Sequence, residues 1–288
     1  MGHKEIFVCL SNGQKAFWIR YLLSRRKETK ASFMIAMFDN EDTSGFRTHY
    51  DTFSMNPNGE TKIGGNRIDN AKRYASDIEN TYSISWSNGE NGMSAISGIT
   101  GLLDLRSQYY LLSPNAKFNG QITYLNESYA IKDYRGMVGY ISQPDYLMHW
   151  TWMHMSGATD KEDMWLDLLI SDRALGGKKI SLLSGRINGK LIRPLGLPAT
   201  FRGNEDISII EGELSAVGKK FNIKSHADKD RTIKVKYDAV RKHDSYCYNS
   251  ELAVTSINYN GRTYDSNISF IEHGILDNLQ GFKEISIK

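Results

Sequence analysis

The sequence predicts an all-β protein made of two antiparallel β-barrels in tandem. The dipeptide Asn-Gly, which accepts the positive φ angles of a tight hairpin turn, occurs seven times. These turns lie at 12–13, 58–59, 88–89, 91–92, 119–120, 188–189 and 260–261. Between them, short segments alternate apolar and polar residues, as strands with one buried face do. Many short strands joined by such turns indicate a sandwich or a barrel. A length of 288 residues is enough for two barrels of about eight strands each.

The first predicted strands lie near the amino terminus. Residues 17–23 place Phe, Ile, Tyr and Leu on one face of a strand, whereas Trp18 and Arg20 lie on the other face. Residues 31–38 are apolar at both odd and even positions, which is typical of a strand buried on both sides. The amino-terminal region therefore supplies both one-sided and two-sided core strands.

The later segments are of two kinds. Residues 82–87 and 232–239 alternate strictly, so each predicts a strand with one face in a core and the other in water. Residues 159–162 resemble the capping box of a helix, yet the apolar run at 165–170 also suits a strand, so both structures stay open there. Residues 66–78 are polar with no firm period and predict no particular element.

The boundary between the two predicted barrels lies near residues 139–144, where the sequence Gly-Tyr-Ile-Ser-Gln-Pro is typical of a linker. We therefore predict an N-terminal barrel at residues 1–142 and a C-terminal barrel at residues 143–288. We detect no close internal repeat. The chain length also agrees with two medium-sized domains.

Composition and charge exclude several classes of protein. The chain is 40% hydrophobic and 24% charged, as ordinary globular proteins are, and its net charge of +3 is too balanced for a nucleic-acid partner. No run approaches the ~20 apolar residues of a membrane span. The apolar run at 6–10 is shorter than the ~7–15 residues of a secretory h-region, so we expect a cytoplasmic protein.

Cys9 and Cys247 are expected to be two buried thiols.

The most unusual segment is 149–154, with the sequence His-Trp-Thr-Trp-Met-His. On a strand, Trp150, Trp152 and His154 share one face, and His149 lies on the other. The two histidines therefore do not converge on one ion, and we expect no metal site. Indoles stabilise cationic charge, and a histidine exchanges a proton near neutral pH, so this face suits a reaction through a carbocation. The alternative is that the tryptophans pack a core and the histidine bonds to a backbone carbonyl.

Further positions offer polar groups. Arg20, beside Trp18, is suited to binding an anion, supporting an acid, or sealing a barrel end against a carboxylate. Glu272 and the adjacent His273 face opposite sides of a strand, so one of them could project inward, although a surface pair is the more common arrangement. Weaker candidates are Asp39, His49 and Tyr129. The Gly-x-Ser-x-Gly of serine hydrolases and the phosphate-binding loop are absent, which argues against hydrolases and kinases.

Three blocks of the sequence together resemble one known family. They are residues 17–21 followed by 37–39, residues 84–86, and Tyr129 with the segment 149–154. These blocks resemble the carotenoid 1,2-hydratase, tocopherol cyclase and AttH-like superfamily, to which some fungal Diels–Alderases and ceramide-handling survival factors are similar. The resemblance implies two lipocalin-like (calycin) barrels, a ligand pocket in or between them, and chemistry on isoprenoid or polyene substrates without a cofactor. It carries over Trp18, Arg20, Asp39, Trp86, Tyr129, His149, Trp150, Trp152, His154 and Glu272 as candidate site residues.

Two functions from different classes follow. The first is a cofactor-free hydratase, cyclase or isomerase of an apolar isoprenoid- or polyene-like substrate. In it, His154, or an inward Asp39 or Glu272, protonates a double bond, and Trp150 and Trp152 shield the cation. The second is a lipid- or pigment-binding carrier of the lipocalin type. A titratable group in the pocket would favour the enzyme, and a purely apolar lumen the carrier. A structural module with filled barrels is a third possibility. We expect no transmembrane segment, and peripheral contact with a membrane stays open.

Overall fold

The computed structural model describes residues 3–25, 29–56, 60–69, 73–76, 82–88, 93–94, 108–143, 149–158, 161–171, 180–192, 199–216, 218–237 and 244–287. In these ranges the chain forms strands, turns and a single short 3₁₀ turn, η1 (Lys229–Arg231), with no α-helix. The predicted all-β class is therefore confirmed. Within the same ranges, no helix has the length and apolar character needed to cross a membrane.

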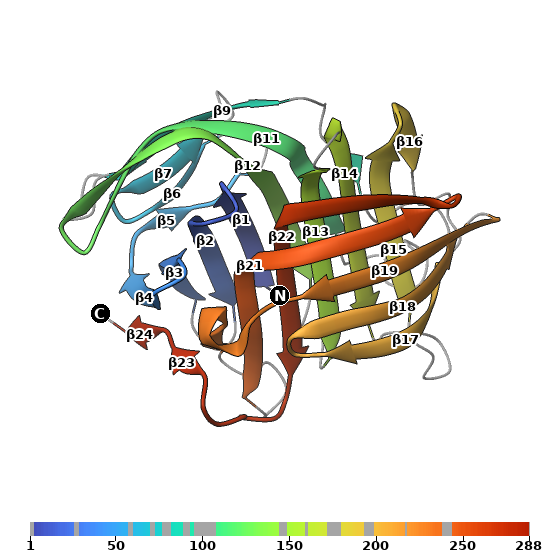
Figure 1. Ribbon diagram of the computed structural model, residues 1–288. Helices are drawn as coiled ribbons and strands as arrows, with labels where there is room; N and C mark the ends of the chain where they lie inside the picture. The colour runs from blue at the N-terminus through green and yellow to red at the C-terminus, as the bar shows by residue number, and fades with distance from the viewer. Residues whose placement is uncertain are drawn as a thin grey trace.

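The first sheet takes its strands from the N-terminal half of the chain and one strand from the C-terminal end (Figure 1). Its strands are β1 (His3–Ser11), β2 (Ala16–Arg25), β3 (Thr29–Phe38), β4 (Thr43–Tyr50), β5 (Phe53–Ser54), β6 (Thr61–Ile63), β7 (Asn66–Asp69), β8 (Arg73–Ser76), β9 (Tyr82–Asn88), β10 (Met93–Ser94), β11 (Gln108–Tyr124), β12 (Glu127–Gln143) and β24 (Ser286–Ile287). They pair in the order β24-β4-β3-β2-β1-β12-β11-β9-β8-β7-β6-β5, and β10 pairs with β11. The region 143–288 thus gives one strand, β24, to the first sheet.

The second sheet takes all its strands from the C-terminal half. They are β13 (Trp150–Ala158), β14 (Lys161–Ser171), β15 (Ile180–Ile187), β16 (Lys190–Ile192), β17 (Thr200–Asp206), β18 (Ile209–Ala216), β19 (Lys219–His226), β20 (Ile233–Tyr237), β21 (Ser245–Tyr259), β22 (Arg262–Ile275) and β23 (Lys283–Glu284). The order is β16-β15-β14-β13-β22-β21-β19-β18-β17, with β20 between β21 and β23. This sheet bends so that β17, β18 and β19 lie in front of β13, β14 and β15 (Figure 1). Among the described residues each sheet runs from edge to edge without closing, so closed tandem barrels stay a prediction.

The described residues form three apolar cores, of which the middle one joins the two sheets. The first core lies within the first sheet and the third within the second, whereas the middle core takes side chains from both. β2 shows how alternation divides its residues, because Phe17 and Ile19 enter the first core and Trp18 enters the middle core. β3 also contributes to both of these cores, which confirms the prediction that residues 31–38 are buried on both faces.

Two segments have no settled prediction, namely 159–170, which suits a helix or a strand, and 66–78, which suits neither. Both form strands where the structure describes them. β14 begins at Lys161 and runs through the apolar stretch at 165–170, so the strand alternative holds there; residues 159–160 lie outside the described ranges. The polar segment 66–78 contains β7 and β8. Burial of the apolar run between neighbouring strands outweighs its local helical signal.

Most described Asn-Gly pairs form the predicted turns. Both residues have positive φ at Asn188-Gly189 (51° and 72°) and at Asn260-Gly261 (54° and 74°), as this turn type requires. The pair at 12–13 lies in the connection between β1 and β2. The pairs at 58–59 and 91–92, together with Gly89, lie outside the described residues.

The hairpin predicted at 119–120 is wrong, because this pair lies inside the long strand β11. The pairing of β11 with β12 shifts register between Phe118 and Gly120, and Gly120 has a φ of 139°. A Cβ atom at this position would lie 2.1 Å from the carbonyl oxygen of Ser83 in β9. The dipeptide therefore forms a bulge within the sheet rather than a reversal of the chain.

Gly120→Ala is expected to lower the free energy of unfolding by about 1–3 kcal/mol, because the new methyl group collides with the Ser83 carbonyl. The matched control is Gly189→Ala, where φ is also positive but nothing lies within 4 Å of the added atom. There only the backbone cost of about 1 kcal/mol remains. Urea denaturation measures both variants, and equal losses would contradict a clash at the bulge.

Candidate functional site

The middle core contains two groups of buried polar side chains. We call the first the histidine cluster and the second the arginine cluster. The histidine cluster consists of Tyr109, Trp152, His154, Ser156 and Asp167. The arginine cluster consists of His3, Glu5, Arg20, Tyr237, Asn249 and Glu272. Both clusters take residues from both sheets, so each forms only when the sheets pack together.

Asp167 is the hub of the histidine cluster. Its carboxylate is 2% exposed and accepts hydrogen bonds from the Tyr109 hydroxyl (2.9 and 3.0 Å), Trp152 Nε1 (2.9 Å) and His154 Nδ1 (3.0 Å). Tyr109 belongs to β11 of the first sheet, whereas the other residues belong to β13 and β14 of the second. Burial, and then the charge of Asp167, raises the pKa of Tyr109 well above its ordinary value, so Tyr109 stays a proton donor.

His154 is fully buried between aromatic rings. Its ring stacks on Trp152, Trp165 and Phe270 at centroid distances of 6.1, 6.3 and 5.9 Å. An ionised carboxylate only accepts hydrogen bonds, so this pairing assigns a proton to His154 Nδ1. The other ring nitrogen, Nε2, lies 3.1 Å from Ser156 Oγ. Nε2 is therefore the nitrogen that can gain or lose a proton.

The order Asp167–His154–Ser156 resembles the acid, base and hydroxyl of a serine hydrolase. However, Ser156 is fully buried and lies two residues from His154 on the same strand. The arrangement therefore favours proton exchange inside the interface over attack on a substrate from solvent. The indoles of Trp152 and Trp165, which stack on the imidazole, can also stabilise a positive charge formed beside it.

Arg20 is the hub of the arginine cluster. It pairs with Glu5 of β1 and Glu272 of β22, and it donates a hydrogen bond to the Tyr237 hydroxyl at 3.0 Å. Its guanidinium carbon lies 4.3 Å from the ring centroid of Trp18. Burial would raise the pKa of Glu5, but the charge of Arg20 helps to hold it below its ordinary value. Pairing with a carboxylate is one of the arrangements predicted for Arg20.

The two clusters lie close together. Glu272 of β22 stands opposite Trp152 in the pairing with β13 and opposite Asn249 in the pairing with β21. The Asn249 side-chain amide donates a hydrogen bond to the Glu272 carboxylate at 3.0 Å. The Phe7 ring is 5.8 Å from the Trp152 ring and 5.3 Å from the guanidinium carbon of Arg20. Phe7 therefore lies between Arg20 of the arginine cluster and Trp152 of the histidine cluster.

Glu251 is a buried carboxyl group outside these ion pairs. It is fully buried at a bulge in β21, on the side of the middle core that holds Cys9 and Arg20. Burial raises the pKa of Glu251 to about 8, an effect larger than the lowering caused by Cys9 and Arg20. At pH 7 it is therefore a neutral acid.

The stability of the wild type, relative to that of Glu251→Gln, is expected to fall as the pH rises from about 5 to 8. The unfolded chain loses this proton near the ordinary pKa of 4.5, whereas the folded chain keeps it up to about 8. Unfolding thus releases a proton in this window, and the stability falls by about 1.4 kcal/mol per pH unit. Below pH 4.5 both states are protonated and the difference is constant. Urea denaturation of both proteins measures the slope, and parallel pH curves would contradict it.

No family model and no curated protein matches the chain. Solved structures do match it over almost its whole length. A protein from Nitrosomonas europaea described as an AttH has 12% identity and a TM-score of 0.61, covering 96% of this chain and 92% of its own. Kievitone hydratase from Nectria haematococca has 12% identity and a TM-score of 0.59, covering 96% and 89%. CghA in complex with Sch210972 has 8% identity and a TM-score of 0.64, covering 95% and 88%.

The chain has the AttH-like fold. The family resemblance predicted from the sequence is thereby confirmed at the level of the fold. The all-β arrangement of strands is consistent with the predicted lipocalin-like fold. Within this AttH-like fold, both polar clusters lie where the two sheets meet.

The AttH-like fold brings together five of the predicted site residues. Trp18, Arg20 and Glu272 meet at the arginine cluster, and Trp152 and His154 belong to the histidine cluster. A sixth, Trp150, is partly buried and packs against the middle core; a Cβ atom at Gly274 would lie 2.0 Å from its ring. The face shared by Trp150, Trp152 and His154 is thus the one that faces the first sheet.

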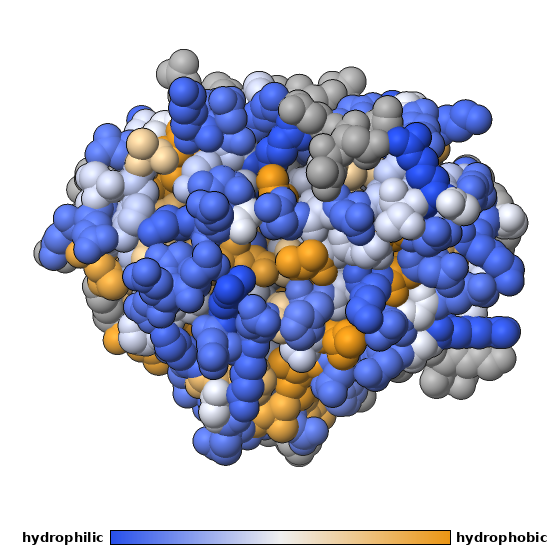
Figure 2. Space-filling model, viewed as in Figure 1, coloured by the Kyte–Doolittle hydropathy of each residue, from blue (hydrophilic) through white to orange (hydrophobic). Residues whose placement is uncertain are grey.

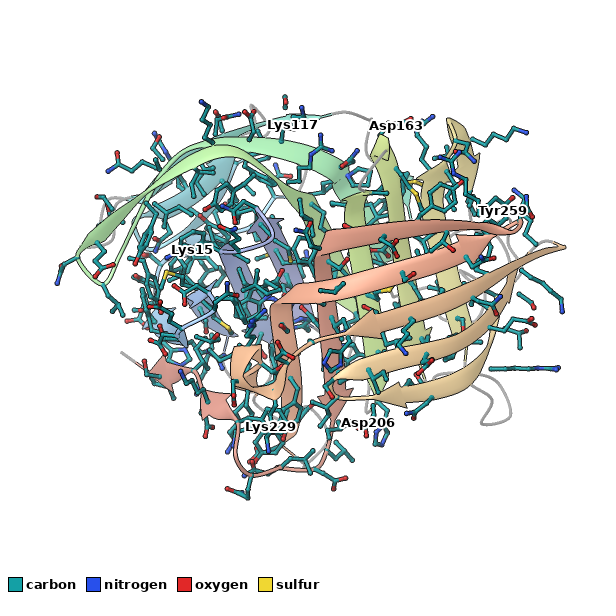
Figure 3. The ribbon with its side chains drawn as sticks, viewed as in Figure 1. Lys15, Lys117, Asp163, Asp206, Lys229 and Tyr259 are labelled. Atoms are coloured by element: carbon teal, nitrogen blue, oxygen red, sulfur yellow. The ribbon has the colours of Figure 1, made fainter. Side chains whose placement is uncertain are left out.

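The other four predicted residues contribute to neither cluster. Asp39 lies in the turn after β3, accepts two backbone N–H bonds of that turn, and pairs with Lys15 at 3.0 Å. The same lysine, labelled in Figure 3, lies 4.5 Å from the ring centroid of Tyr129. Trp86 packs against the first core, and His149 is exposed just before β13.

Two expectations about buried groups are corrected by the structure. Glu272 and His273 are not a surface pair, because they are 5% and 3% exposed. β22 has the middle core on one face and the third core on the other, so Glu272 meets Arg20 while His273 Nδ1 lies 3.0 Å from Thr151 Oγ1. His154 bonds to side chains rather than to a backbone carbonyl.

Sequence reasoning missed several residues of this interface, among them Glu5, Tyr109, Asp167 and Glu251. A usable signal existed for Asp167, because it is a lone carboxylate inside the apolar run 165–170, where a buried acceptor needs donors. Glu5 gave a similar signal, since it precedes the apolar run 6–10. Tyr109 and Glu251 gave none that distinguishes them from surface residues.

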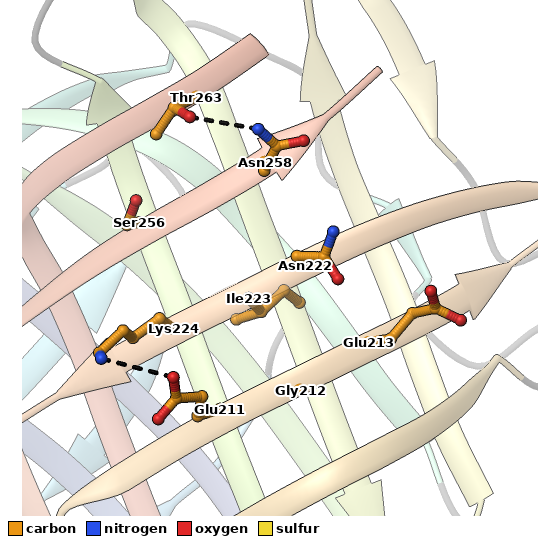
Figure 4. A pocket seen from close by; sticks show the side chains of 9 residues that line it. All are labelled: Glu211, Gly212, Glu213, Asn222, Ile223, Lys224, Ser256, Asn258 and Thr263. Atoms are coloured by element: carbon orange, nitrogen blue, oxygen red, sulfur yellow. Dashed lines mark hydrogen bonds and ion pairs between the residues drawn. The ribbon is translucent and has the colours of Figure 1, made fainter. Parts of the chain in front are cut away.

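The outer surface offers a different environment. The face seen in Figure 2 is mostly hydrophilic. A groove of about 350 Å³ lies on the outer face of β18, β19, β21 and β22 (Figure 4). It is lined by Glu211, Gly212, Glu213, Asn222, Ile223, Lys224, Ser256, Asn258 and Thr263. Among the described residues, no group of three or more His, Cys, Asp or Glu side chains could hold a metal ion.

Proposed function

We propose that this chain is a cofactor-free enzyme that hydrates, cyclises or isomerises an apolar isoprenoid- or polyene-like substrate. The reaction starts with proton transfer at the middle core. The observation that carries the proposal is the histidine cluster, in which Asp167, Tyr109 and His154 form a buried acid–base network from both sheets. Burying such groups costs several kcal/mol, and apolar residues would join the sheets at least as well. Networks of this kind are common at reactive sites.

The chemistry follows from the bonding of the imidazole. In its protonated form, His154 keeps Nδ1–H on Asp167 and delivers the Nε2 proton to one carbon of a double bond. The π electrons form the new C–H bond, and the neighbouring carbon becomes cationic beside Trp152 and Trp165. In a hydration, a water lone pair forms the C–O bond and the oxonium proton returns to Nε2. In a cyclisation, an internal double bond attacks the cation instead, and a ring proton returns to Nε2.

Access to this nitrogen requires movement. His154 and Ser156 are fully buried, so a substrate reaches Nε2 only when side chains at the interface shift. The comparisons support catalysis in this setting, because one protein of the same fold is named a hydratase and another was solved with the small molecule Sch210972. We transfer the reaction class to this chain as part of the proposal.

A second candidate function is a carrier that encloses an apolar ligand without changing it. The observation that favours it is the apolar and aromatic content of the middle core, which includes Phe7, Trp18, Trp165 and Phe270. Aromatic walls with few polar groups are typical of sites that bind apolar small molecules. The carrier does not need the protonation of His154.

The test is an untargeted mass-spectrometric comparison of an apolar extract incubated with and without the protein in ¹⁸O-labelled water. A product carrying the label, or a new isomer, is expected only with the wild type. His154→Gln should lower its formation by about 10²–10⁴-fold, because the proton donor is lost while the size is nearly kept. The control is His226→Gln, an exposed histidine that also has a carboxylate partner. Enrichment of one unchanged lipid would support the carrier and contradict the enzyme.

A further inference from the structure

Four neighbouring side chains of the middle core have buried polar atoms without a well-formed hydrogen bond. They are Trp18 Nε1, Arg20 Nε, Asn249 Oδ1 and both carboxyl oxygens of Glu251. All four residues are nearly or fully enclosed, with exposures of 0 to 4%. Buried polar atoms are nearly always paired. Glu251 is held by weak side-chain hydrogen bonds with Cys9 and Asn249, whereas Trp18 Nε1, Arg20 Nε and Asn249 Oδ1 are left without a partner.

These four residues are next to one another. The guanidinium carbon of Arg20 lies 4.3 Å from the ring centroid of Trp18. The side chains of Cys9 and Asn249 form hydrogen bonds with Glu251, and the charge of Arg20 acts on the same carboxyl group. Cys9 stands opposite Trp18 in the β1–β2 pairing. The unpaired atoms therefore belong to one place in the interface, at the edge of the arginine cluster.

The unpaired atoms include both donors and acceptors. Trp18 Nε1–H and Arg20 Nε–H only donate, and Asn249 Oδ1 only accepts. Glu251, which is neutral at pH 7, can do either. A group that satisfies this set must accept two hydrogen bonds and donate at least one. Water and an alcohol have this capacity, whereas a hydrocarbon has none of it and a carbonyl oxygen cannot donate.

Charge points to the same conclusion. The guanidinium of Arg20 is already paired with Glu5 and Glu272, so an anion bound beside it would add uncompensated negative charge. A cation would have to compete with Arg20 for the same two carboxylates. A neutral ligand group avoids both costs.

We propose that Trp18, Arg20, Asn249 and Glu251 form a binding site for a neutral hydroxyl group, as water before the reaction and as the alcohol of the product after it. This inference rests on the proposed function and selects hydration among the three reactions named there. In a hydration, the oxygen of the reactant water becomes the oxygen of the product alcohol, so one site serves both. Phe7 lies between Arg20 of this site and Trp152 of the histidine cluster, so the site adjoins the cluster that holds the proposed proton donor.

The first experiment measures binding without turnover, using linalool and myrcene, an isoprenoid alcohol and a hydrocarbon of related skeleton. In Trp18→Phe and Glu251→Met, the affinity for linalool is expected to fall roughly three- to tenfold, because each change removes one hydrogen-bonding group. The affinity for myrcene should stay unchanged, and Glu251→Gln should restore most of the linalool affinity. Circular dichroism checks that each variant is folded.

Ser269→Ala is the matched control, because Ser269 is also fully buried with an unpaired hydroxyl but lies outside this group. It should change neither affinity. Equal weakening of both probes by the variants, an equal effect of the control, or failure of the wild type to bind linalool would overturn the hydroxyl site.

The second experiment is a pair of crystal structures, without ligand and with linalool. Water is expected within hydrogen-bond distance of Trp18 Nε1 and Arg20 Nε in the first, and the linalool hydroxyl in its place in the second. An ordered water that linalool does not replace would overturn the role in ligand binding. If the variants weaken the binding of linalool but not of myrcene, and the extract gives no product, the enzyme is rejected and the hydroxyl site is kept. If the extract gives an unlabelled isomer, and the variants do not distinguish linalool from myrcene, the enzyme is supported and the hydroxyl site is rejected.

Discussion

Arg20→Met is expected to lower the free energy of unfolding by about 3–5 kcal/mol. Methionine keeps much of the side-chain volume but removes the charge that lies between Glu5 and Glu272. All three residues are 5% exposed or less, so two carboxylates would remain buried without a counterion. Without the charge of Arg20, burial raises the pKa of Glu5 in the folded chain. The loss should therefore be greater at pH 8 than at pH 5, because the unfolded chain is ionised in that range.

The control for this prediction is Lys224→Met. Lys224 pairs with Glu211 at the surface, where the two side chains are 62% and 51% exposed. Water and salt screen such a pair, so its loss should cost about 1 kcal/mol or less. Urea denaturation compares the two variants. Similar small losses would show that the arginine cluster does not hold the two sheets together electrostatically.

The alternation of residues was sufficient to predict which side chains share a strand face. The pattern at 17–23 placed Trp18 and Arg20 on one face, and both enter the middle core. The pattern at 149–154 grouped Trp152 with His154, and both belong to the histidine cluster. A strand face is a local property, because successive side chains point to opposite sides whatever the rest of the chain does.

Which faces meet is not a local property. Asp167 meets Tyr109 across 58 residues of sequence, and Arg20 meets Glu272 across 252. No spacing along the chain encodes such pairs, since they depend on how two sheets pack. This is why Asp39, which has a promising residue type, lies instead in a turn, where its carboxylate accepts local N–H bonds.

The error at Asn119-Gly120 has the same origin. The dipeptide tolerates positive φ, and a hairpin turn is the commonest structure that needs it. A bulge in a long strand needs it too, and here neighbouring strands on both sides of β11 hold the chain extended. Local preference permits both structures, and the pairing of the sheet selects one.

Asp167→Asn is expected to reduce product formation by about 10²–10⁴-fold and the free energy of unfolding by about 1–3 kcal/mol. The amide has the size of the carboxyl but replaces one acceptor oxygen with a donor. One N–H group, of Trp152 or His154, then loses its acceptor. Without a negative partner at Nδ1, the imidazolium loses its stabilisation, and the proton at Nε2 is no longer held for transfer.

The matched control is Asp163→Asn, an exposed carboxylate on the same strand, labelled in Figure 3. It should change neither stability nor product formation. Nitrogen NMR compares the protonation of the His154 ring in the wild type and in Asp167→Asn. We expect it to change in the variant, whereas a purely structural role of Asp167 predicts no change. Loss of stability with unchanged product formation would assign the histidine cluster to packing of the two sheets. The proton donor would then have to be sought elsewhere in the middle core, for example at Glu251, a buried acid whose raised pKa keeps it neutral at pH 7.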